Sequence, residues 1–100
     1  MFQKLKHLKD LRSQAKQMQN ALKDKTVEAT AAHGRVKITM DGNLNVTSVV
    51  IEPALLAPDQ QATLQNALTE AFNDCLKKAQ RVMADYLKTT GQFNIPGLTS

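Results

Sequence analysis

Basic side chains recur at a helical spacing near the N-terminus. Lys9, Lys16 and Lys23 are seven residues apart, and Arg12 lies between the first two. On a helix these residues share one side, and Lys9 and Lys23 stand about 21 Å apart along the axis. A cationic row of this length can lie along several phosphates of a nucleic acid and release counterions as it binds. The simpler alternative is a solvated helix face, which is what most lysine-rich faces are.

A second basic group follows near the C-terminal end of the chain. It consists of Lys77, Lys78, Arg81 and Lys88, and the acidic residues Asp59, Glu70 and Asp74 precede it. Cations at the end of a helix also complement its macrodipole, a contribution of about 0.3–1 kcal/mol. The group therefore has three interpretations: solubility, helix stabilisation, or a second part of a nucleic-acid surface.

The residues that could support catalysis are isolated from one another. Apart from Asp10 at i+3 from His7, neither His7 nor His33 has a His, Cys or carboxylate at ligand spacing. Cys75, the only cysteine, excludes an internal disulfide and a multi-cysteine metal site. Its place on an apolar helical stripe predicts a small core residue rather than a nucleophile. No glycine-rich phosphate loop is present. We therefore expect no enzyme activity, no cofactor and no metal site.

The net charge is concentrated in one segment. The 100 residues carry a net charge of +4, of which residues 1–25 contribute +5, residues 26–58 contribute −1, and residues 59–100 contribute zero. Apolar residues make up 42% and charged residues 22%, which excludes a disordered tail. No apolar run approaches the roughly 18 residues of a membrane span, and no signal-peptide pattern follows the N-terminal cations. We expect a cytoplasmic location.

Two helices and a sheet are expected to position the basic residues. Residues 3–25 lack Gly and Pro and are rich in good helix formers. Their apolar row has a coiled-coil-like spacing and comprises Leu5, Leu8, Leu11, Ala15, Met18 and Leu22. Residues 59–90 predict a long helix with Asp59 as its N-cap and Gly91 just past its end. Its apolar stripe comprises Leu64, Leu68, Ala71, Cys75, Ala79, Val82 and Tyr86. Residues 91–100 are predicted to form an irregular tail.

Residues 26–52 predict a three-stranded antiparallel meander. Val36, Ile38 and Met40 alternate with polar residues, which is typical of a half-buried strand. The turn residues 41–43 separate this strand from a β-branched segment that ends at residue 51. Alternation fails at Val49-Val50, which indicates either a β-bulge or a strand covered on both faces.

The long helix indicates self-association. Its roughly 29 residues would extend about 43 Å, whereas a compact chain of 100 residues has a diameter of roughly 30–35 Å. Its apolar stripe continues toward the overhanging end, so either the first helix or a second chain must cover it. A small chain with 4% aromatic residues also buries little apolar surface alone. These constraints predict a homodimer.

Four segments occur in order at suitable spacing: Ala15–Gln19, Val36–Gly42, Val49–Leu56 and Ala71–Lys78. Together with Pro96-Gly97 they resemble the YbaB/EbfC family of bacterial nucleoid-associated proteins over nearly the whole chain. The resemblance implies an α–β–β–β–α protomer and a homodimer whose helices project like tweezers. It also implies binding to DNA with little sequence specificity.

We therefore expect one α+β domain over residues 1–100 that dimerises and binds duplex DNA in the nucleoid, mainly through phosphates. Such binding would affect nucleoid organisation and gene expression. The candidate DNA-binding residues are Lys4, Lys6, Lys9, Arg12, Lys16, Lys23, Lys77, Lys78, Arg81 and Lys88. The expected partners are double-stranded DNA and a second copy of the chain, with no membrane and no small-molecule substrate. The alternative is a helical, dimeric protein-interaction adaptor that does not bind DNA.

Overall fold

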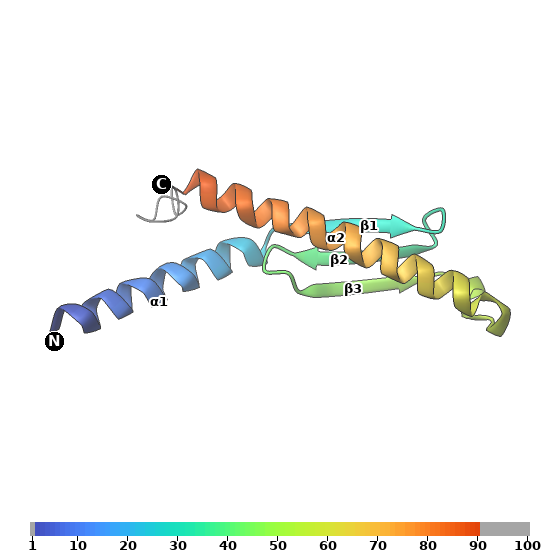
Figure 1. Ribbon diagram of the computed structural model, residues 1–100, viewed down its shortest axis with the longest axis horizontal. Coiled ribbons are helices and arrows are strands. Elements are labelled where there is room, and N and C mark those ends of the chain that lie inside the picture. The colour runs from blue at the N-terminus through green and yellow to red at the C-terminus, as the bar shows by residue number, and fades with distance from the viewer. Residues whose placement is uncertain (1, 91–100) are drawn as a thin grey trace.

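A computed structural model of the protein describes the backbone of residues 2–90 and the side chains of residues 8–90. The elements in chain order are helix α1 (Phe2–Lys23), strands β1 (Thr26–Ala31), β2 (Val36–Asp41) and β3 (Val46–Ile51), the short 3₁₀ helices η1 (Pro53–Leu56) and η2 (Pro58–Gln60), and helix α2 (Gln61–Thr89). In Figure 1, α1 leaves one end of the sheet and α2 runs along one face. The predicted α+β fold is confirmed. The predicted tail, with Gly91 and Pro96-Gly97, lies outside the described residues.

The helices end and begin close to the predicted positions. α1 ends at Lys23 because the chain then turns: the Lys25 N–H donates to Leu22 O at 3.2 Å, and β1 follows. The prediction that Asp59 caps α2 is wrong. Asp59 lies within η2, and the N-cap of α2 is Gln60, which makes no side-chain capping hydrogen bond. Pro58 favours this short turn, because its fixed φ and missing N–H suit the first position of a helix.

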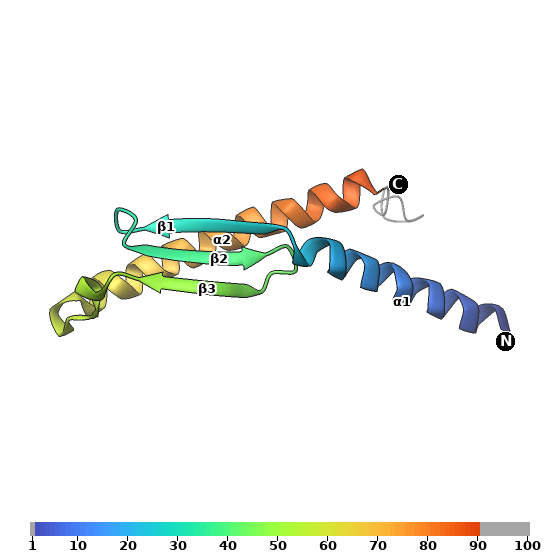
Figure 2. The same cartoon turned by 180° about the vertical axis from the view of Figure 1, so that it is seen from behind.

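The three strands form an antiparallel meander in the order β1-β2-β3. Ala29 of β1 pairs with Ile38 of β2, and Ile38 pairs with Val49 of β3. These three residues share the face that α2 approaches. Figure 2 shows the opposite face, which no helix of the described chain covers. A half-covered antiparallel sheet of this kind matches the alternation in the sequence.

A β-bulge lies in β3, two residues before the predicted irregularity. Thr39 pairs with Ser48 and Met40 pairs with Val46, so that the residue between Ser48 and Val46 is extra. Neither explanation offered for Val49-Val50 is correct. These two valines are paired regularly, lie on opposite faces, and are 49% and 51% exposed.

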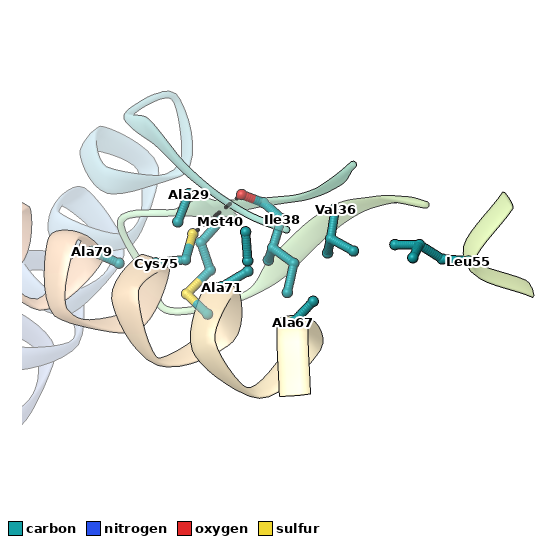
Figure 3. Packing of buried hydrophobic residues seen from close by; sticks show 10 residues of the cluster. Ala29, Val36, Ile38, Met40, Leu55, Ala67, Ala71, Cys75 and Ala79 are labelled. Carbon is teal, nitrogen blue, oxygen red and sulfur yellow. Dashed lines mark hydrogen bonds between the residues drawn. The ribbon is translucent and has the colours of Figure 1, made fainter. Parts of the chain in front are cut away.

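α2 packs mainly against β1 and β2 through small side chains. Ala67, Ala71, Cys75 and Ala79 recur every four residues and are at most 3% exposed. The sheet contributes Ala29, Ala31, Val36, Ile38 and Met40, and Leu55 of η1 lies at one end of the cluster (Figure 3). The predicted stripe included three of the four small residues, but it placed Leu64 and Leu68, both half-buried, where Ala67 is buried. The prediction that Cys75 is a core residue is confirmed.

The molecule is elongated rather than compact. It measures 63 × 26 × 19 Å and has a radius of gyration of 18.7 Å, against about 13 Å for a compact domain of this length. α1 and the last turns of α2 project from the same end of the sheet and diverge (Figures 1 and 2). Leu8 and Leu11 are 52% and 50% exposed. The part of the apolar row of α1 that contains Leu8 and Leu11 is therefore uncovered in the described chain, whereas Leu22 at its end is buried.

The Cys75 thiol makes stability depend on pH. Its Sγ lies 3.5 Å from Ile38 O and 3.7 Å from Val27 O, and the side chain is fully buried. Burial raises the pKa of the Cys75 thiol above its ordinary value of 9.0. The folded protein therefore retains the thiol proton at pH values where the unfolded chain has lost it. The contribution is complete below the unfolded pKa and is lost as the pH rises through the folded pKa.

We expect the free energy of unfolding to fall more steeply between about pH 8 and about pH 10 in the parent than in Cys75→Ala. Urea unfolding of both proteins at matched concentrations measures the difference. The variant retains every other side chain of the parent and therefore serves as the control. Equal losses in both proteins would contradict the assignment.

Candidate nucleic-acid interface

The basic row of α1, defined as Lys9, Arg12, Lys16 and Lys23, is exposed along its whole length. None of the four forms an ion pair among the described side chains. The row lies roughly 100° around the helix from the apolar row that contains Leu8 and Leu11. Lys4 and Lys6 belong to the same helix, but their side chains lie outside the described residues. α1 thus presents a cationic surface that no carboxylate of the described chain neutralises by direct contact.

The basic residues of α2 are also exposed, but their surface carries both signs of charge. Lys77, Arg81 and Lys88 lie on the side of α2 that also bears Asp74 and Asp85, with each acid within four residues of a base. Neighbouring opposite charges weaken the field that a polyanion would experience. The surface of α2 is therefore a weaker candidate than the basic row of α1.

Lys78 has a structural contact that its neighbours lack. Its Nζ donates to the backbone carbonyl of Glu28 at 2.9 Å, on the free edge of β1. The Glu28 carboxylate in turn lies 3.9 Å from Lys37 Nζ on the outer face of the sheet. A lysine that covers an edge strand satisfies an unpaired carbonyl and obstructs pairing with another strand. This contact gives Lys78 a role within the fold, and a role in binding stays a prediction.

The two basic groups lie on different helices of the chain. α1 carries the first group, and the projecting end of α2 carries Lys88, while Lys78 contacts the sheet. Between the start of β1 and the last turns of α2 is a recess of about 550 Å³, lined by Lys25, Thr26, Val82, Asp85, Tyr86, Thr89 and Thr90. Lys25 is not among the candidate residues predicted from the sequence. Its membership of the basic segment 1–25 was the available signal, and its place at the junction of α1 and β1 was not apparent from spacing.

An apolar groove lies between α2 and β3. Its volume is about 450 Å³, and its lining comprises Ile38, Val46, Val49, Leu68, Thr69, Phe72 and Asn73. Val46 and Phe72 are each 42% exposed. Within residues 2–90, no other segment covers this groove. Separately, none of the helices in this part of the chain is long and apolar enough to span a bilayer.

A family model described as the YbaB/EbfC DNA-binding family matches residues 1–92. The chain belongs to this family. A nucleoid-associated protein of Thermoanaerobacter sp. strain X514 is 37% identical to this YbaB/EbfC chain over 95 residues, which cover 94% of the chain and 86% of the relative. Another, from Pelotomaculum thermopropionicum, is 33% identical over 99 residues, 98% of the chain and 94% of the relative.

A solved structure has the same fold. The crystal structure of an uncharacterized protein from Helicobacter pylori superposes with a TM-score of 0.63, covering 87% of this YbaB/EbfC chain and 95% of that protein. The two sequences are 21% identical, so this likeness concerns the fold alone.

The contact of Lys78 with β1 predicts a difference between two adjacent lysines of this YbaB/EbfC chain. Lys78→Met should lower the free energy of unfolding by about 1 kcal/mol, because it removes the hydrogen bond to Glu28 O. Lys77→Met is the matched control, since it removes the same charge from an exposed neighbour. Urea unfolding at a fixed protein concentration measures both. Equal effects would show that the contact contributes nothing beyond the charge.

Proposed function

We propose that the protein is a nucleoid-associated protein that binds duplex DNA as a homodimer, mainly through phosphates and with little sequence specificity. It acts in the nucleoid, within the cytoplasm, and contributes to nucleoid organisation and gene expression. The single observation that carries the proposal is the exposed, unpaired basic row of α1 in a chain of the YbaB/EbfC DNA-binding family. The proposal is for a binding protein and not for an enzyme.

Phosphate contact is favoured over contact with bases. The cations of α1 lie on a regular helix and can follow a strand of phosphates, which carries affinity without reading sequence. Base stacking on single strands needs exposed aromatic side chains. Among the described residues, Phe72 is exposed but belongs to the apolar groove, and Tyr86 is half-buried in the recess.

Uncovered apolar surface supports the homodimer. Leu8 and Leu11 on α1, and Val49 and Phe72 at the groove, are each between 42% and 52% exposed. Burial of apolar surface contributes roughly 25 cal/mol per Å², and a second copy can cover both surfaces reciprocally. A dimer would also double the net charge of +4 and increase the attraction for a polyanion. The same apolar surfaces favour the second candidate function, a protein-interaction adaptor without DNA binding.

Removing charge from α1 should weaken DNA binding without regard to sequence. The double variant Lys9→Gln/Lys16→Gln should lower the affinity for two unrelated duplexes to a similar extent. The slope of log K against log salt should become shallower by up to about 2 for each α1 helix that contacts the DNA, because roughly 0.9 counterion is released per phosphate contact. Fluorescence anisotropy across a salt series measures both quantities.

The control for this prediction is Arg35→Gln/Lys37→Gln, which removes the same charge from the β1–β2 turn and from β2. It should retain the parent's salt slope. If the α1 variant binds as tightly as the parent, α1 does not contact DNA. If the parent binds no duplex at about 50 mM salt, the adaptor function replaces the proposal.

Two adjacent valines test which face of the sheet meets a second copy. We expect the parent to sediment with about twice the chain mass of 11.0 kDa at micromolar concentrations. Val49→Lys should shift the protein toward the mass of one chain, because Val49 lines the apolar groove. Val50→Lys, at an equally exposed position on the outer face, should leave the dimer intact. A parent that sediments as a single chain would refute the homodimer.

A further inference from the structure

Among the described side chains, only those of the last turns of helix α1 pack against the body of the protein. Leu22 is fully buried and Met18 is half-buried, whereas every side chain of residues 8–17 is exposed. In Figure 1 the helix extends away from the sheet, beginning at this attachment. The direction of the helix is therefore determined at Leu22 and its immediate neighbours.

The turn between β2 and β3 holds this end of α1. The Gly42 N–H donates to Leu22 O at 2.9 Å, and Asn43 Nδ2 donates to Gln19 O at 2.9 Å. Leu22 O is one of the last carbonyls of the helix, which lack partners within the helix itself. A Cβ added at Gly42 would lie 2.9 Å from Leu22 O and 3.0 Å from Leu22 Cβ. Any side chain at position 42 must therefore displace α1 or the turn.

Asp41 gives this turn its shape. The side chain is buried, and its Oδ1 accepts the backbone N–H groups of Asn43 at 2.9 Å and of Asn45 at 3.1 Å. These two hydrogen bonds hold the backbone that presents the Gly42 N–H and the Asn43 amide to α1. These hydrogen bonds consequently hold the turn in one backbone conformation.

A small rotation of α1 about its attachment at Leu22 produces a large displacement at the far end of the helix. Lys9 lies about 20 Å along the axis from Leu22, so a rotation of about 20° would move it by about 7 Å. Successive phosphates of one DNA strand are separated by about 3.4 Å along the duplex axis. A rotation of this size would move the basic row of α1 away from the phosphates that it would otherwise follow.

We propose that Gly42 and Asn43 are positioning residues for DNA binding: they contact the last turns of α1 and fix the direction of its basic row. The inference rests on the proposed function, because it takes this row as the DNA contact. Neither residue has to touch DNA for its replacement to weaken binding.

The experiment compares Asn43→Ala and Gly42→Ala with the matched control Asn45→Ala. Asn45 belongs to the same turn, but its amide donates to Asp41 Oδ2 at 3.5 Å rather than to α1. Spin labels on cysteines introduced at the exposed positions Ser13 and Ser48 report the direction of α1. Labelled chains are diluted with unlabelled protein, so that only distances within one chain are measured. Unlabelled variants are titrated with two unrelated duplexes over a salt series.

We expect both test variants to shift or broaden the distance between the two labels and to bind DNA at least about threefold more weakly. The salt slope should become shallower by about 1, since fewer phosphates are contacted at once. Circular dichroism and sedimentation should show parent-like folding and mass. Asn45→Ala should retain the parent's distances, affinity and slope.

The outcomes separate this inference from the function on which it rests. A parent that binds no duplex at low salt overturns the proposed function and the positioning role with it. A parent that binds while both variants keep its affinity and slope overturns the positioning role alone, as does an unchanged label distance. If Gly42→Ala does not fold, Asn43→Ala decides, because it adds no atoms to the contact.

Discussion

The close approach of α2 to two strands determines the rest of the structure. The face of α2 that meets the sheet carries only small side chains, none larger than the CH2SH group of cysteine, so the helix can lie directly on β1 and β2. These residues are Ala67, Ala71, Cys75 and Ala79. Larger apolar residues cannot occupy that narrow space, and Phe72 is displaced to the flank, beside β3. The apolar groove is therefore a consequence of the small-residue row. Beyond Ala79 the helix passes the start of β1, and its last turns project from the end of the sheet.

The elements could be predicted from the sequence because their signals are local. Alternation at Val36, Ile38 and Met40 and the uninterrupted helical segments depend on neighbours in the chain. The side of α2 that meets the sheet could be predicted only in part. Ala67 is buried because α2 lies close to the sheet, and the distance between helix and sheet is a tertiary property. The contact of Lys78 with Glu28 joins residues fifty positions apart, so no spacing rule indicates it. Asp59 does not cap α2, because Pro58 favours a 3₁₀ turn that contains Asp59.

The features of the candidate site likewise divide into local properties, which the sequence predicts, and tertiary properties, which it does not. That Lys9, Lys16 and Lys23 share one side of a helix is a property of helical geometry, and the structure has all three exposed. The separation of this charge from the acidic residues of the body is a tertiary property. α1 carries most of the basic segment away from the sheet, whereas the bases of α2 remain among Asp74 and Asp85. One chain thus carries two basic groups with the same number of long cationic side chains but different electrostatic surroundings.

The two rows of α1 allow the helix to serve two contacts at once. Its apolar row and its basic row lie roughly 100° apart, so a partner protein that covers Leu8 and Leu11 leaves Lys9 and Lys16 free. Covering the apolar row would also restrain an arm that the body holds only by its last turns. A restrained arm loses less conformational freedom when it binds a second ligand, so that association of two chains and phosphate binding would favour each other. Coupling of this kind requires that the direction of the arm already be set in each chain, which the turn at Asp41, Gly42 and Asn43 accomplishes through Leu22.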